Sequence, residues 1–196
     1  MVTTSAMTRR RVLQGALGAL ASGAGTARAS GAEVEALLRE GRVVIAFRHA
    51  LAPGTFDPPG FRLGDCSTQR NLNDEGRAQA RRLGAWFAQR GLQPRRVRSS
   101  PWCRCLDTAQ LAFGQAPPWA ALGSPRGATE TTNAQSLREL REALAAASRQ
   151  PGFEVWVTHM FVLSDLAGQG STSGEGLVLR SGDRGEVRLL ARLPPA

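Results

Sequence analysis

The sequence predicts a three-layer α/β/α sandwich with a mostly parallel central sheet. Two runs at 42–47 and 153–158 have the nearly unbroken apolar pattern of strands that are buried on both faces. Segments with helical patterning alternate with the predicted strands along the chain, which is typical of such sandwiches. A chain of 196 residues fits one domain, at 30–196, behind a leader at 1–29.

Each predicted element follows from its local pattern and from the residues at its ends. The predicted strands are 42–47, 95–99, 153–158, 176–179 and 186–190, and the predicted helices are 32–40, 74–90, 101–113, 134–149 and 161–167. Glycine ends the first two helices, at Gly41 and Gly91. Asn73, Ser100 and Asn133 are the predicted N-caps of the second, third and fourth helices. The proline- and glycine-rich loop at 50–72 is long for a small domain, and such loops are usually functional or mobile.

The leader has the composition of a bacterial export signal. Thr8-Arg9-Arg10-Arg11-Val12-Leu13-Gln14 resembles a twin-arginine signal, and a short apolar run and a small-x-small pattern that ends at Ala29 follow it. The apolar run is roughly half the ~20 residues that span a bilayer, so we expect no stable membrane anchor. These features predict a periplasmic or secreted protein that meets the twin-arginine export machinery before maturation.

The composition excludes several kinds of chemistry. All 25 basic residues are arginine and tyrosine is absent, which excludes a lysine Schiff base, a lysine-bearing phosphate loop and a phenolic acid or base. The net charge is +9, and the leader supplies four of its arginines and no acid. The other arginines are scattered without interleaved aromatic residues, so we expect no nucleic-acid partner. Guanidinium groups do suit a phosphate-bearing substrate.

The three cysteines allow more than one arrangement in an oxidising compartment. Cys103 and Cys105 are too close for an easy bridge to each other, so Cys66 is expected to pair with one of them and to leave the other free. A zinc site would be the alternative use of these thiols. The C-x-C spacing is not the usual zinc-ligand spacing, and we expect no metal.

The two histidines of the chain, His49 and His159, both follow a predicted buried strand. Ligands bind at the carboxyl ends of strands in parallel sheets, where the loops leave the sheet. Arg48, Ser99 and Ser100 fall at equivalent positions. This shared location favours a functional role for both histidines over that of core residues.

Four segments resemble one known family in their order along the chain. Arg48-His49-Ala50, N-L-N-D-E-G-R-A-Q-A at 71–80, S-S-P-W-C-R-C-L-D-T-A at 99–109 and V-W-V-T-H-M at 155–160 are similar to motifs of the histidine phosphatase (phosphoglycerate mutase-like) superfamily. The resemblance covers about 42–168. Within the superfamily, an exported R-H-A variant is most similar to lipopolysaccharide core heptose phosphatase-like proteins.

The resemblance implies a phosphoglycerate mutase-like fold and a phosphatase that hydrolyses phosphomonoesters without a cofactor. His49 would attack phosphorus and form a phosphohistidine, with Arg48, Arg104 and His159 as catalytic groups that also bind the phosphate. The expected substrate is a phosphorylated small molecule or an envelope glycan, such as an envelope sugar phosphate. The loop arginines Arg62 and Arg70 are further substrate-binding candidates, each with a solvated loop residue as the plainer interpretation. Ser100 is explained as a helix cap.

The sequence departs from the family pattern at the general acid. Met160 follows His159 where one branch has an aspartate, and the segment at 118–127 lacks the glutamate of many other members. Glu175, Glu130 and Asp65 are the spare candidates. Without an acid, the enzyme would be restricted to good leaving groups such as phosphohistidine, or the chain would be a non-catalytic phosphate-binding or interaction module.

Overall fold

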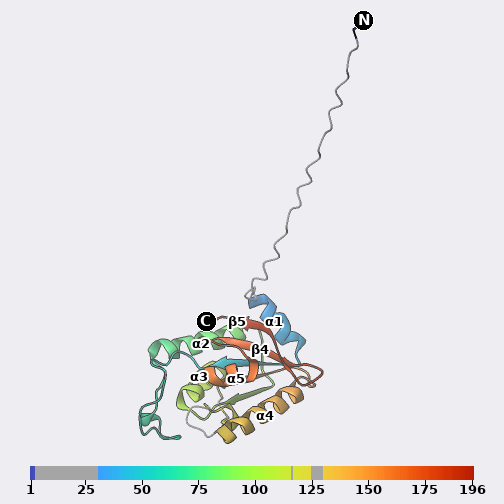
Figure 1. The fold of residues 1–196 in the computed structure, drawn as a ribbon. Helices are drawn as coiled ribbons and strands as arrows, with labels where there is room; N and C mark the ends of the chain where they lie inside the picture. Colours follow the sequence, from blue (N-terminus) through green and yellow to red (C-terminus); the bar gives the residue numbers. More distant parts are fainter. Residues whose placement is uncertain (3–30, 116, 125–129) are drawn as a thin grey trace.

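The computed structural model describes residues 1–2, 31–115, 117–124 and 130–196, with the backbone alone at 130–132 (Figure 1). The predicted leader, apart from its first two residues, lies outside the described residues. The helices are α1 Gly31–Glu40, α2 Asp74–Gln89, α3 Cys103–Phe113, α4 Glu130–Ala147 and α5 Met160–Ala167, with short 3₁₀ helices η1 Cys66–Thr68 and η2 Ala120–Leu122. The strands are β1 Val43–Arg48, β2 Arg96–Ser99, β3 Phe153–Thr158, β4 Gly176–Ser181 and β5 Val187–Leu193.

The predicted sandwich is confirmed. One five-stranded sheet has the order β2-β3-β1-β4-β5. β3 lies between β1 and β2 and is parallel to both, and β4 is antiparallel to β1 and β5. The carboxyl ends of β1, β2 and β3 therefore meet at one edge of the sheet, as the register pairs Arg48↔Thr158 and Ser99↔Val157 show.

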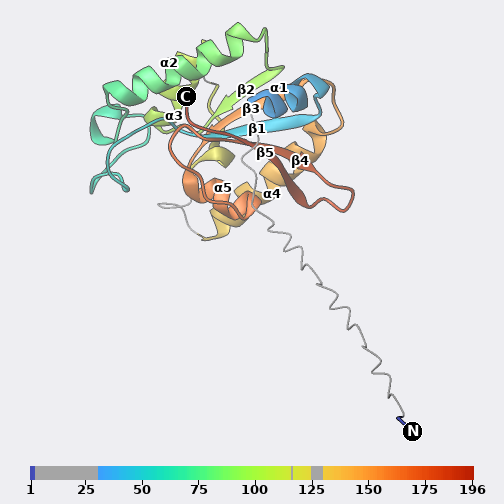
Figure 2. The ribbon, with the colours of Figure 1, turned by 90° about the horizontal axis from the view of Figure 1, so that it is seen from above.

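Helices cover both faces of the sheet, so β1 is buried on both sides (Figure 2). Val43, Ile45 and Phe47 pack against α1, α2 and α3, whereas Val44 and Ala46 face α4 and α5. Successive strand residues point to opposite faces, and each fully buried aliphatic or phenylalanine side chain contributes about 1.5–3 kcal/mol. The apolar run around β1 thus joins the two halves of the core.

The end of β2 differs from the sequence prediction. Ser100 does not begin a helix, because its backbone N–H continues the sheet pattern by donating to the Val157 carbonyl at 2.8 Å. The helix α3 starts only at Cys103, with Trp102 as its N-cap and Gly114 as its left-handed C-cap. Ser100 is therefore available for a different contact, described below. The cap predicted at Asn73 is present, where the side chain accepts from the Gly76 N–H.

The long loop after β1 is held against the start of α2. The Leu51 N–H donates to the Gln79 side chain at 2.9 Å. Gly76 lets the loop approach, since a Cβ at this position would overlap the Leu51 carbonyl oxygen. The loop is thereby fixed beside the carboxyl edge of the sheet.

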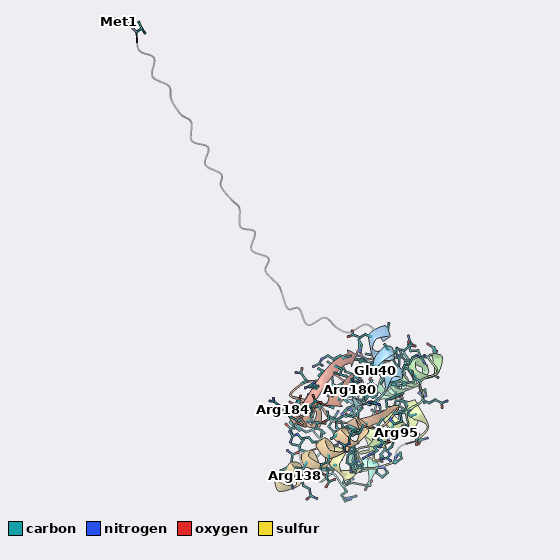
Figure 3. All side chains as sticks on the ribbon, turned by 90° about the vertical axis from the view of Figure 1, so that its right-hand side faces the viewer. Met1, Glu40, Arg95, Arg138, Arg180 and Arg184 are labelled. Atoms are coloured by element: carbon teal, nitrogen blue, oxygen red, sulfur yellow. A yellow bond between two sulfur atoms is a disulfide. The ribbon has the colours of Figure 1, made fainter. Side chains whose placement is uncertain are left out.

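The hairpin of β4 and β5 forms the side of the sheet opposite β2. Arg180 at the end of β4 pairs with Glu40 at the end of α1, with 2.9 Å between Nη2 and Oε1 (Figure 3). No helix in the described part of the chain combines the length and apolar character that crossing a membrane requires.

Candidate active site

The two histidines come together at the carboxyl edge of the sheet. His49 follows β1 and His159 follows β3, and the His49 backbone N–H donates to the Thr158 carbonyl at 2.9 Å. Both side chains are buried, and their ring centroids lie 5.6 Å apart. They line a cavity of about 210 Å³ together with Arg48, Arg70 and Arg104. The parallel register of β1 and β3 is what brings these residues, distant in sequence, to one place.

The hydrogen bonds of His49 leave its Nε2 as the reactive nitrogen. Nδ1 lies 2.7 Å from the Ala50 carbonyl oxygen, which can only accept. Nδ1 therefore carries the proton and Nε2 keeps a free lone pair. Burial lowers the pKa of His49 to about 3, and the charges of Arg104, Arg70 and Arg48 add to this effect. His49 is thus a neutral imidazole at neutral pH, as a nucleophile must be.

His159 has the opposite tautomer. Arg104 Nη2 lies 3.3 Å from Nδ1 of His159, and a guanidinium can only donate, so Nδ1 accepts. The proton is then on Nε2, which donates to Ser100 Oγ at 2.7 Å. Burial lowers the pKa of His159 well below its usual value, and Arg104 and His49 lower it further. His159 is therefore a fixed, neutral group that orients one end of Arg104.

Ser100 is a site residue that sequence reasoning assigned to a structural role. A serine before a proline is a common helix-cap signal. That signal explained Ser100 without a partner, so nothing in the sequence indicated a contact with His159. The only sequence signal was the position of Ser100 directly after a predicted strand. Its partner lies 59 residues away, on a loop that the sheet register brings alongside.

The three arginines that line the cavity have donor groups left over. Nη1 of Arg48 donates to the Ser171 carbonyl at 3.0 Å, and Nη1 of Arg70 donates to the Ala52 carbonyl. The Nε atoms of Arg48, Arg70 and Arg104 are all buried without a partner. Buried donors are nearly always paired in folded proteins, so this concentration indicates a place for an anion.

The arginines also repel one another. Burial lowers the pKa of Arg70 to about 10, with Arg104 as the next cause, and burial followed by Arg104 lowers the pKa of Arg48. Guanidinium groups in proteins are not deprotonated at neutral pH. A doubly charged oxyanion would relieve this repulsion and satisfy the free donors.

Asp57 is the one acidic residue among the described residues that line the cavity. It is not among the site residues that the sequence predicts. Its Oδ1 accepts from Arg104 Nη1 at 2.8 Å and from the Arg70 backbone N–H at 3.0 Å. In the sequence, Asp57 is one of two acids in the loop at 50–72, and Asp65 is the one predicted as a candidate general acid. Nothing local separates them, because only the path of the loop decides which one faces the arginines.

The other predicted site residues do not line the cavity. Arg62 is exposed and pairs at 2.6 Å with Asp65, which is half-buried and also caps η1. Glu175 accepts from the Thr172 N–H at 2.8 Å and pairs with Arg192 at 2.8 Å. Each of these acids is therefore used in its own local structure. The side chain of Glu130 lies outside the described residues.

A disulfide links the loop to the helix that carries Arg104. Cys66, at the start of η1, bonds to Cys103, the first residue of α3 and the neighbour of Arg104. This distinguishes the two pairings that the sequence allowed. Cys105 is the free thiol, and burial raises its pKa to about 12, so it is not a reactive thiolate.

Comparison with known protein families gives one match. Residues 64–140 match the histidine phosphatase superfamily (branch 1). This match supports a relationship between the chain and the histidine phosphatase superfamily. The matched segment contains Arg70 and Arg104, whereas Arg48, His49 and His159 lie outside it and are tied to it by the fold. No curated protein matches the chain.

Solved structures of histidine phosphatases and related phosphatases share the fold. The protein histidine phosphatase SixA complexed with tungstate aligns with a TM-score of 0.52 and 16% identity, over 78% of this chain and 97% of that one. A mycobacterial glucosyl-3-phosphoglycerate phosphatase in complex with VO3 gives 0.57 and 16%, over 76% and 98%. A phosphoserine phosphatase mutant from Entamoeba histolytica in complex with phosphoserine gives 0.51 and 13%, over 76% and 95%. At these identities, the likeness shows the fold.

Neither histidine is expected to titrate between pH 5 and 8 in the folded protein. Both pKa values are lowered, so both rings stay neutral as the pH falls through the usual value near 6.5. Because the chain has two histidines, their ring ¹⁵N signals in NMR spectra at successive pH values report this directly.

The same chain unfolded in urea is the control, and there both signals should shift near pH 6.5. The unfolded chain then binds more protons than the folded one below that pH. Stability should therefore fall on acidification by about 1.4 kcal/mol per pH unit for each histidine. A folded-state midpoint near 6.5 for His49 would contradict a neutral, desolvated nucleophile.

Proposed function

We propose that this protein is a phosphatase that hydrolyses phosphomonoesters through a phosphohistidine intermediate on His49. The observation that carries the proposal is the neutral His49, with Nε2 unprotonated, in a cavity lined by three arginines with unpartnered donors. A simple phosphate-binding pocket has no need of an unprotonated, desolvated imidazole. The superfamily match and the shared fold support the same reaction class.

In the first step, His49 Nε2 attacks phosphorus and the bond between phosphorus and the ester oxygen breaks. The leaving group departs with that electron pair and takes a proton from solvent water, and the phosphoryl group is now bound to Nε2. Arg48, Arg70 and Arg104 donate to the phosphoryl oxygens while charge spreads over them. His159 acts through Arg104, whose Nη2 it holds in place.

In the second step, water attacks the phosphohistidine and the phosphorus–nitrogen bond breaks, which returns the electron pair to Nε2. Asp57 is placed to accept one proton from that water, since its side chain lines the cavity. The incoming phosphate competes with Asp57 for Arg104, so the ion pair loosens when the site fills. The proton then leaves to solvent, and inorganic phosphate is released.

We further propose that the enzyme works outside the cytoplasm, on a phosphorylated small molecule or glycan of the envelope. The twin-arginine-like leader supports export, and the Cys66–Cys103 disulfide is suited to an oxidising compartment.

The proposed reaction is tested by trapping the intermediate. The protein is mixed with ³²P-labelled phenyl phosphate in a rapid-quench instrument and divided between base and acid. A phosphohistidine is stable in base and lost in acid, so protein-bound label should survive only the base quench. Absence of label together with absence of turnover on phenyl and ethyl phosphate would instead indicate a phosphate-binding module.

A further inference from the structure

Part of the cavity lining is apolar, and the phosphoryl chemistry does not use it. The cavity is lined, beside the arginines, by the three rings of Phe56, Phe61 and Phe161 and by the thioether of Met160. We call these four residues the aromatic collar. They come from two separate parts of the chain, the loop after β1 and the start of α5. The collar therefore forms only in the folded protein.

Contacts with the catalytic groups hold the collar in place. Phe61 stacks on Trp102 with 5.9 Å between centroids, and the edge of Trp102 packs against the ring of His159 at 5.3 Å. Met160 directly follows His159, and its sulfur lies 3.7 Å from Nη1 of Arg48. Phe56 precedes Asp57, whose bond to Arg104 anchors this part of the loop. The apolar side chains therefore lie next to the groups that would hold the phosphate.

Phe56 is an unusual surface residue. It is 64% exposed, and it is the one exposed aromatic residue among those that the structure describes. The neighbouring Leu63 is similarly exposed, at 52%, but does not line the cavity. An exposed ring in the lining of a charged cavity offers apolar area that a bound ligand can cover.

The size and polarity of the cavity restrict the ligand. A volume of about 210 Å³ is below the range of about 300–1,000 Å³ that holds drug-sized molecules, so it suits a phosphoryl group and little more than one ring. Thr55 and Ser124 are the neutral hydroxyl side chains of the described lining. A sugar presents several hydroxyl groups that need partners, and this lining has few to offer.

We propose that the substrate is an aryl phosphomonoester, in which the phosphate is carried by a single aromatic ring that packs against the aromatic collar. The inference rests on the proposed phosphatase function and, of the two kinds of substrate proposed there, favours a small molecule over an envelope glycan. An aryl oxide is also a better leaving group than an alkoxide. That fits a site in which the lining carboxylate, Asp57, is already paired with Arg104.

The test compares Phe56→Ala with Leu63→Ala as the matched control from the same loop. The rate constant kcat/KM is measured for phenyl, cyclohexyl and ethyl phosphate. We expect Phe56→Ala to lower the ratio of phenyl to ethyl phosphate by about tenfold, and Leu63→Ala to keep the wild-type ratio. The intrinsic leaving ability of each substrate cancels in this comparison, so the change reports packing alone.

Two outcomes would overturn the proposal. An unchanged phenyl-to-ethyl ratio in Phe56→Ala would show that the collar does not bind the leaving group. An equal loss for cyclohexyl and phenyl phosphate would show a general apolar site rather than an aromatic one. Both results leave turnover intact, whereas failure of the phosphatase function would appear as no turnover and no phosphohistidine with any of the three esters.

Discussion

Replacing His49 with asparagine is expected to lower kcat/KM for phenyl phosphate by at least about 10⁴-fold and to abolish the base-stable label. Asparagine is polar and smaller than histidine, and its amide N–H can donate to the Ala50 carbonyl as Nδ1–H does. It has no lone pair on nitrogen that can attack phosphorus. The loss would therefore reflect the missing nucleophile and not an unfilled polar site. Steady-state rates and rapid-quench labelling measure the two effects together.

Arg77→Gln is the matched control for the His49 variant. Arg77 lies on α2, pairs with Asp107 at 3.3 Å and is outside the cavity, so its loss should change kcat/KM less than about twofold. Circular dichroism of both variants checks the fold. Because His159 is the only other histidine, a label that persists in His49→Asn would point to His159 as the nucleophile and would refute the assignment.

Removing the disulfide by Cys66→Ser/Cys103→Ser is expected to lower the free energy of unfolding by about 4 kcal/mol. The bond closes a loop with a sequence separation of 37, and on the loop-entropy account this constrains the unfolded chain. For a domain of this size, the expected decrease in Tm is about 10 °C. Denaturant unfolding and thermal scans provide the two measurements.

Reduction provides the control for the disulfide variant. Wild-type protein in dithiothreitol should approach the stability of the double serine variant, and the variant itself should not respond to dithiothreitol. The free Cys105 is buried and remains reduced in both proteins, so it does not confuse the comparison. Equal stability of the oxidised wild type and the variant would show that the loop is held by its other contacts, such as Asp57 with Arg104.

Much of the fold could be predicted because it follows from short-range patterns. The apolar residues of β1 and β3 are buried on both faces. Continuous apolar runs of this kind predict central strands without knowledge of any tertiary contact. Asn73 and Gly114 mark helix ends through hydrogen bonds and backbone conformation within a few residues. The start of α3 could not be read in this way, because the sheet bond of Ser100 to Val157 outweighed its cap signal.

Some residues of the candidate site could likewise be predicted from the sequence, and others could not. His49 and His159 stand at strand ends, so the parallel sheet alone predicts that they meet. Asp57 and Ser100 entered the site only through partners 47 and 59 residues away. Arg62 and Arg70 looked alike in the sequence, yet Arg70 lines the cavity and Arg62 pairs with Asp65 at the surface.

The layered fold, the two histidines at the edge of the sheet and the arginine chemistry suited to phosphate all follow from patterns in the sequence. These depend on side-chain type and on periodicity, which act over a few residues. The tautomers of the histidines, the partner of Cys66, the place of Asp57 and the aromatic collar depend on tertiary contacts. The His159 tautomer is set by Arg104 and Ser100. The partner of Cys66 and the place of Asp57 depend on the path of the loop after β1, which is set by contacts with α2 and α3 and not by a pattern of its own.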